Sequence, residues 1–170
     1  MATAIYITRE ELVRHTPLNG NIDMDKIIHF SKIAQDIHIQ GFLGTRLYDK
    51  LNTDIIAGNL AGTYLNLVNK YLKPVVIHLT FLEFLPFSQY TISNNGVFKK
   101  TAESSTIPSV EEMDRMTDAA RDTADHYVRR LIDHLTFESG KGTYPEYNLI
   151  TSNSDEMQPQ KDISFGGWQI

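Results

Sequence analysis

The chain has 170 residues, of which 41% are hydrophobic, and this composition fits one globular domain with a buried core rather than a disordered chain. Its formal net charge of −5 argues against a surface that wraps nucleic acid, because phosphate binding needs clustered Lys and Arg. The absence of cysteine excludes disulfides, thiolate metal sites and a cysteine nucleophile.

Helical signals dominate the first third of the chain. Thr8 and Glu11 have the spacing of a capping box, which predicts a short helix to about Arg14. After a break over 16–21, Asp23 is placed to cap a second helix, and a third helix is expected from about residue 45 to Gly58. Helical spacing is kept by the apolar residues Ile27, Phe30, Ile33, Ala34 and Ile37 in the second helix and by Leu47, Leu51, Ile55 and Ile56 in the third.

The centre of the chain is its most apolar part. Helical spacing resumes after Gly62, and Pro74 is placed to begin a new helix or to form a corner. Apolar side chains cover every face of residues 75–87, which predicts a helix surrounded by other helices. This stretch is too short for a membrane span, which needs about 20 residues. No secretory signal is visible in the first residues, so we expect the protein to be made and kept in a cytoplasm.

A turn and a long helix follow. Residues 93–96, with the sequence Ser-Asn-Asn-Gly, are typical of a tight turn, so Asn94 and Asn95 should lie at the tip of a short β-hairpin or projecting loop that also contains Val97 and Phe98. Ser109 begins a second capping-box pattern and a long amphipathic helix that should end near residue 137.

Glycine and proline interrupt every helical pattern after residue 137. We therefore predict two parts, a helical bundle over 1–137 and an extended C-terminal arm over 138–170. The arm has aromatic and apolar residues that favour an interface, although it could also fold back on its own bundle or fray. Those expected at an interface are Tyr144, Tyr147, Phe165, Trp168 and Ile170.

Residue patterns that carry catalytic chemistry are missing from the sequence. The six histidines have no metalloprotease spacing, and the glycines at 41–44 and 58–62 lack the continuation of a phosphate loop, so we expect these glycines to end helices. Glu83, the one carboxylate in the apolar helix, should pair with Lys, Arg or Tyr of a neighbouring helix or lie at a subunit boundary, unless it is a perturbed acid in a pocket. We predict no catalytic, cofactor-binding or metal-binding residues, hence no enzyme.

One longer pattern is similar to a known family. Residues 37–51, Ile-His-Ile-Gln-Gly-Phe-Leu-Gly-Thr-Arg-Leu-Tyr-Asp-Lys-Leu, resemble a stretch of the head-tail connector proteins of tailed bacteriophages, particularly the crAss-like phages of Bacteroidetes. Similar features are Leu-Lys-Pro at 72–74, Asn-Gly-Val-Phe-Lys-Lys-Thr at 95–101 and Tyr-Pro-Glu-Tyr at 144–147. The resemblance covers roughly residues 5–150.

This resemblance implies an all-α fold and a structural role in the virion. Such adaptors form a dodecameric ring beneath the portal protein, join capsid to tail at the neck, contact other neck and tail proteins, and surround the DNA exit channel without sequence-specific binding. The loop around residue 95 and the arm would then contact partners, with no cofactor and no membrane. The alternative is a soluble helical ligand-binding or regulatory module with a pocket near Glu83 and His78.

Overall fold

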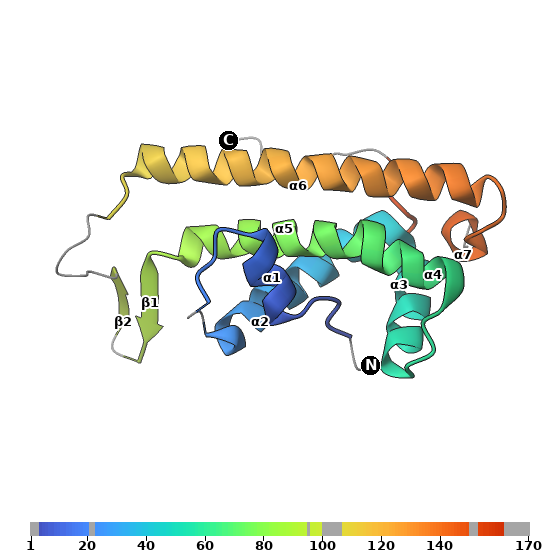
Figure 1. The fold of residues 1–170 in the computed structure, drawn as a ribbon, viewed down its shortest axis with the longest axis horizontal. Coiled ribbons are helices and arrows are strands. Elements are labelled where there is room, and N and C mark those ends of the chain that lie inside the picture. Colours follow the sequence, from blue (N-terminus) through green and yellow to red (C-terminus); the bar gives the residue numbers. More distant parts are fainter. Residues whose placement is uncertain (1–3, 21–22, 95, 100–106, 150–152, 162–170) are drawn as a thin grey trace.

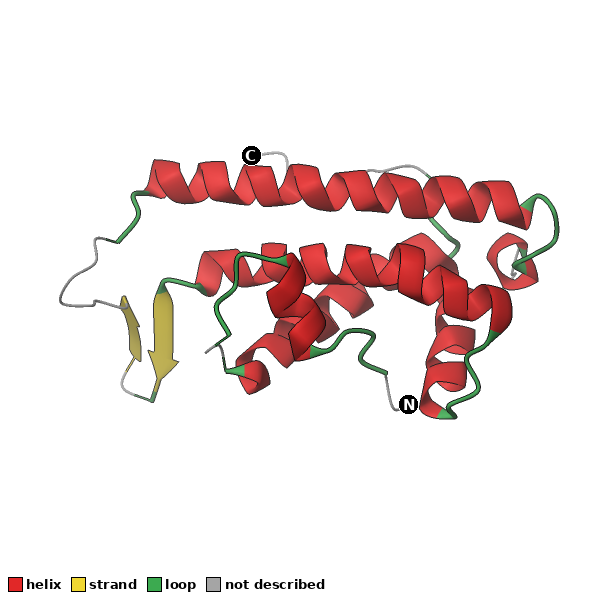
Figure 2. Ribbon diagram, viewed as in Figure 1, coloured by secondary structure: helices red, strands yellow, loops and turns green. Residues whose placement is uncertain are grey.

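The computed structural model describes residues 4–20, 23–94, 96–99, 107–149 and 153–161. Three layers of helices are visible in Figure 1, with α6 (Val110–Ser139) along one side and α5 (Lys73–Phe84) in the middle. α1 (Arg9–His15) and α2 (Met24–Ala34) lie on the other side of α5. The predicted all-α fold is therefore confirmed, and helices make up most of the ribbon in Figure 2.

α5 is the central helix that its composition predicted. It contacts both α2 and α6, so opposite faces of the helix are covered. Val75, Val76 and Leu79 have no exposed surface, and Pro74 lies in the first turn, where its missing N–H removes no helical hydrogen bond. Burying a Leu or Val side chain stabilises a fold by about 1.5–3 kcal/mol, so α5 contributes strongly to stability.

The helices before α5 are more continuous than expected. A π-helical segment, Gln35–Ile39, joins α2 to α3 (Gln40–Ile56), and a second one, Val68–Leu72, joins α4 (Gly62–Leu67) to α5. Each π-helical turn accommodates an extra residue within a helix, so the chain need not end the helix there. The expectation that the glycines at 41–44 end helices was wrong for Gly41, which is helical, whereas Gly44 has non-helical φ and ψ and separates two helical parts of α3. Gly58 directly follows the C-cap of α3 and has a positive φ of 68°, as expected of a helix-ending glycine.

The predicted hairpin is present. After a 3₁₀ turn at Leu85–Phe87, β1 (Tyr90–Ser93) pairs antiparallel with β2 (Gly96–Lys99). Figure 1 shows this hairpin at one end of the bundle, beyond the C-terminal end of α5 and near the start of α6. Asn94 lies in the turn, and Asn95 lies outside the described residues.

Both predicted capping boxes are also present. The Thr8 hydroxyl accepts from the Glu11 N–H while the Glu11 carboxylate accepts from the Thr8 N–H, and Ser109 and Glu112 do the same for α6. Ala120, Ala124, Leu131 and Leu135 of the predicted apolar stripe are buried in α6, whereas Met116, also predicted to face the core, is exposed and Val128, which was not predicted, is buried.

The first part of the C-terminal arm differs from the expectation, whereas residues 153–161 are non-helical, as an extended arm predicts, and fold back on the bundle. α6 continues past residue 137 to Ser139, and a short helix, α7 (Pro145–Asn148), packs against α3 and α6. Tyr144 and Tyr147 are each only 1% exposed and belong to the core. The division at 137/138 thus falls inside a helix, and the first part of the arm completes the bundle.

Candidate interaction surfaces

The hairpin exposes apolar side chains on both of its faces. In the observed register Tyr90 pairs with Lys99 and Phe98 with Thr91, so side-chain alternation puts Tyr90 and Val97 on one face and Phe98 on the other. The exposed fractions are 38% for Tyr90, 64% for Val97 and 52% for Phe98. Neither face is covered by the residues that the structure describes.

An isolated two-stranded hairpin is at best marginally stable in water, and a stable one needs a third strand or a surface against which to pack. At its root, this hairpin is linked to the bundle by an aromatic cluster. The Phe30 ring lies 5.6 Å from that of Phe84 and 5.4 Å from that of Phe87, and Phe87 is half exposed. The apolar surface of the hairpin therefore continues onto the end of the bundle.

A hollow of about 530 Å³ opens at the start of α6. Its walls combine apolar and charged side chains, namely Ile107, Pro108, Glu112, Arg115 and Met116. Met116 and the nearby Val110 are both exposed. This hollow thus offers an open apolar surface within the first two turns of a helix.

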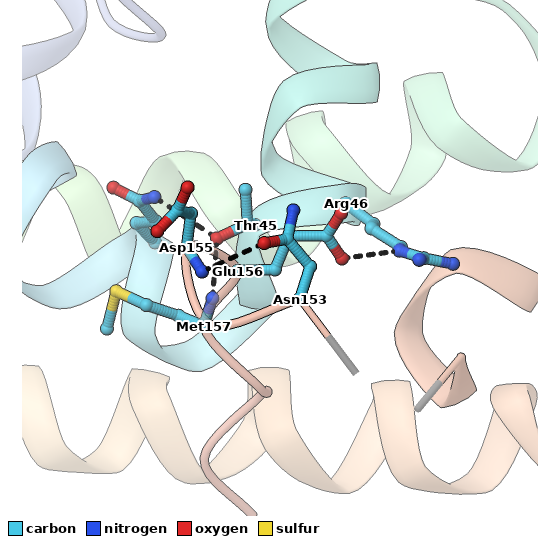
Figure 3. A network of polar contacts seen from close by, with 7 residues as sticks. Thr45, Arg46, Asn153, Asp155, Glu156 and Met157 are labelled. Atoms are coloured by element: carbon cyan, nitrogen blue, oxygen red, sulfur yellow. Dashed lines mark hydrogen bonds and ion pairs between the residues drawn. The ribbon is translucent and has the colours of Figure 1, made fainter. Parts of the chain in front are cut away.

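Residues 153–161, called the strap below, run along α3 (Figure 3). The Thr45 N–H donates to the Met157 carbonyl at 3.0 Å, and the Met157 N–H donates to Thr45 Oγ1 at 2.9 Å. Further along, the Gln160 N–H donates to the Gly41 carbonyl at 2.9 Å. Arg46 Nε also forms an ion pair with Glu156 Oε2 at 2.7 Å. The strap is therefore held mainly through backbone groups.

Gly44 makes room for the strap. Its φ of 74° and ψ of 158° break the helix, and this region of backbone space is essentially restricted to glycine. A Cβ at this position would lie 2.8 Å from Pro159 Cδ and 3.2 Å from the Met157 carbonyl oxygen. The strap can cross α3 at this point because residue 44 has no side chain.

The residues predicted to form an interface have separate locations. Val97, Phe98 and Asn94 are exposed on the hairpin, as expected of a contact surface. By contrast, Tyr144 and Tyr147 pack inside the chain, and their side chains are not presented to a partner. Asn95, Phe165, Trp168 and Ile170 lie outside the described residues.

The Tyr144 side chain helps to fix α7 to the bundle. Its hydroxyl donates to the Thr63 carbonyl at 3.3 Å and lies 3.3 Å from His134 Nε2. The His134 ring is stacked on that of Tyr71, with 3.9 Å between centroids. Burial lowers the pKa of His134 and raises that of Tyr144, which favours the neutral form of both side chains.

Glu83 has a partner of a different kind from those predicted. Its Oε1 lies 2.8 Å from Nε2 of His38, in the π-helical segment before α3, and both side chains are partly exposed. A Lys, Arg or Tyr partner had been expected, and histidine was missed because its position on a neighbouring helix depends on the π-helical turn.

A second hollow, of about 290 Å³, lies between α5 and α6. His78 lines it, and Glu83 does not, so the two residues proposed for one pocket are not together there. The His78 ring stacks on Tyr127 with 4.8 Å between centroids, and burial lowers its pKa. The other lining residues are mostly apolar: Pro17, Phe81, Met116, Ala119, Ala120 and Thr123.

Within the described part of the chain, no group of three or more His, Asp or Glu side chains is placed to hold a metal ion. None of its helices is both long and apolar enough to cross a membrane.

Comparison with known proteins gives one match. Residues 39–157 match the family of unknown function DUF6712. Neither the curated proteins nor the solved structures gave a match. The matched stretch begins just before the Gly44 kink and ends at Met157, so it contains both sides of the first strap contacts. Since the match covers well over half of the sequence, the chain belongs to the DUF6712 family.

Proposed function

We propose that this chain is a non-enzymatic structural protein that assembles into a ring, of the head-tail connector type found beneath the portal of tailed phages. In this role the ring joins the capsid to the tail at the virion neck and surrounds the channel through which DNA leaves. Its partners are further copies of the chain, the portal protein, and other neck or tail proteins.

The hairpin is the observation that carries this proposal. A hairpin with apolar side chains on both faces and no cover from the described residues needs a partner surface for its stability. Exposed apolar patches of this kind are typical of protein contacts. The net charge of −5 also suits a conduit, because an acidic protein does not adhere to DNA.

The test is an assembly measurement with the portal protein of the same phage. We expect the co-expressed proteins to form a complex in which electron microscopy shows a ring of helical density at the portal outlet. Val97→Asp and Phe98→Asp should each prevent or weaken the complex, since a buried unpaired carboxylate is strongly unfavourable in an interface. A chain that remains separate from the portal at high concentration would contradict the proposal.

Ile56→Asp is the matched control. Ile56 is 56% exposed, like the hairpin residues, but it ends α3, far from the hairpin in Figure 1. The same substitution there should leave the complex intact. If Ile56→Asp weakened the complex as much as Phe98→Asp, exposed apolar surface in general, rather than the hairpin, would support assembly.

A second candidate function is a soluble ligand-binding module, which is favoured by the hollow next to His78. Its volume of about 290 Å³ is near the lower end of the range of small-molecule sites, about 300–1,000 Å³. A bound small molecule would raise the melting temperature of the isolated chain. A screen that shows such a shift, abolished by Ala119→Trp, would favour this function over the first.

A further inference from the structure

The geometry points to a specific contact between two copies of this chain, in which the hairpin of one copy docks in the hollow at the start of α6 of another. This inference rests on the proposed assembly function and names the surfaces that would make it work. In the described part of a single chain, each surface is open.

The first argument is that the two surfaces match in polarity. Val97 and Phe98 present exposed apolar side chains, and the hollow offers apolar surface from Ile107, Pro108 and Met116. Joining them would remove apolar surface of both copies from water, which is the main driving force of association.

The second argument is charge, which distinguishes the α6 hollow from two other hollows of the described chain. The hairpin ends in Lys99, followed in the sequence by Lys100. A hollow beside α1 is lined by Arg9, Glu10, Val13, Arg14 and Gly20 and would repel a basic strand end with its two arginines. The hollow beside His78 has no carboxylate in its lining.

The stretch of α6 around this hollow is acidic. The lining itself pairs Glu112 with Arg115, and Glu111 and Asp114 add two carboxylates on the same part of the helix. Acidic residues are favourable in the first turn of a helix, and the Glu111 and Asp114 side chains are exposed, so they can attract a basic partner. Charge complementarity of this kind determines orientation and excludes wrong partners.

The third argument concerns which copy supplies the hairpin. In its own chain the hairpin leaves the hollow open, because the described residues that line it are all from 107–116. Each copy thus offers one unfilled hollow and one uncovered hairpin. A contact that joins two different patches is heterologous, and it gives a ring when its rotation about an axis closes.

The absence of cysteine makes a clean cross-linking test possible. One chain carries Phe98→Cys, a second chain of different length carries Met116→Cys, and the two are co-assembled and treated with a short bifunctional thiol reagent. We expect a product that contains one chain of each kind. Pairing Phe98→Cys with Ile56→Cys is the control, which should give no such product.

A second measurement tests the charge argument. Lys99→Glu should lower the association constant by up to about fivefold, the range for an exposed ion pair. Combining it with Glu111→Lys and Asp114→Lys in the receiving chain should restore association. Glu112 is left unchanged because its carboxylate caps α6.

The outcomes separate the two proposals. The docking inference would be overturned, and the ring function left standing, if rings formed without the mixed cross-linked product. The same conclusion would follow if a double variant with Phe98→Cys and Met116→Cys cross-linked only within one chain. A mixed product in a closed dimer that never binds the portal would support the docking contact and refute the ring. A chain that stays monomeric with and without the portal would refute both.

Discussion

Replacing Gly44 with alanine is expected to lower the free energy of unfolding by about 2–4 kcal/mol. The backbone at residue 44 has φ 74° and ψ 158°, and holding an alanine there costs about 1–3 kcal/mol. The new Cβ would also lie 2.8 Å from Pro159 Cδ, so the strap must leave its position on α3.

Losing the strap adds a smaller amount. Each of its hydrogen bonds to Gly41 and Thr45 contributes about 0.5–1.5 kcal/mol net, and much of this is offset by the conformational entropy that the released strap regains. We therefore expect about 1 kcal/mol from this source. Urea unfolding followed by circular dichroism measures the total, and hydrogen exchange of the Met157 amide reports the strap alone.

Gly41→Ala is the matched control for this prediction. Gly41 is helical, and a Cβ there would meet Gln160 at 3.6 Å, an ordinary van der Waals contact. Since alanine is favoured over glycine in a helix by about 0.5–1 kcal/mol, this variant should be at least as stable as the wild type. The reasoning would be refuted if Gly44→Ala stayed within about 0.5 kcal/mol of the wild type with unchanged exchange at Met157.

Three further predictions concern the core and its polar pairs. Burial lowers the pKa of His134 from its ordinary value of 6.5, so protonation favours the unfolded chain, and the free energy of unfolding should fall as the pH drops below 6.5. Urea unfolding of His134→Phe should show a smaller decrease with pH than the wild type. An identical decrease in both proteins would exclude this histidine as a cause. Glu83→Gln should change the free energy of unfolding by less than about 1 kcal/mol, because the pair with His38 is partly exposed, and a loss above about 2 kcal/mol in thermal unfolding would contradict this. Leu79→Ala should lower the free energy of unfolding by about 2–5 kcal/mol and Leu82→Ala by clearly less, because Leu79 is fully buried and Leu82 only partly. Equal decreases of the two variants in chemical denaturation would count against the central position of α5.

The parts of the fold that depend on local sequence could be predicted. Both capping boxes form because a hydroxyl and a carboxylate three residues apart satisfy each other's backbone N–H groups, whatever the rest of the chain does. The hairpin follows from a turn sequence in the same way, and the burial of α5 follows from its apolar composition. For the hairpin, this reasoning placed Val97 and Phe98 in the extended segment after the turn, where β2 is observed.

The position of the strap could not be predicted, because its contacts are non-local. Thr45 and Met157 are 112 residues apart and meet mainly through backbone atoms, which leave no periodic side-chain pattern. The one local signal was Gly44 inside an otherwise helical stretch, which can indicate the close approach of another backbone segment. That signal identifies a place where a segment could pass, but not the segment that does so.

The burial of Tyr144 and Tyr147 was missed for a related reason. Gly140, Gly142 and Pro145 end the helical periodicity, and this was interpreted as the start of an extended arm. In the structure the same residues turn the chain back, so that the single turn of α7 packs against both α3 and α6. A stretch this short contains too few residues for its periodicity to indicate which face is buried.

The strap also has a consequence for the order in which the protein folds and opens. It follows α7, which already packs on α3, and ordering its residues costs conformational entropy. The side chain of Met157 stays exposed, so little apolar burial offsets this loss. Among the described segments, the strap should therefore join the bundle last during folding and detach first under a mild challenge, so we expect a protease to cut residues 153–161 before the described helices.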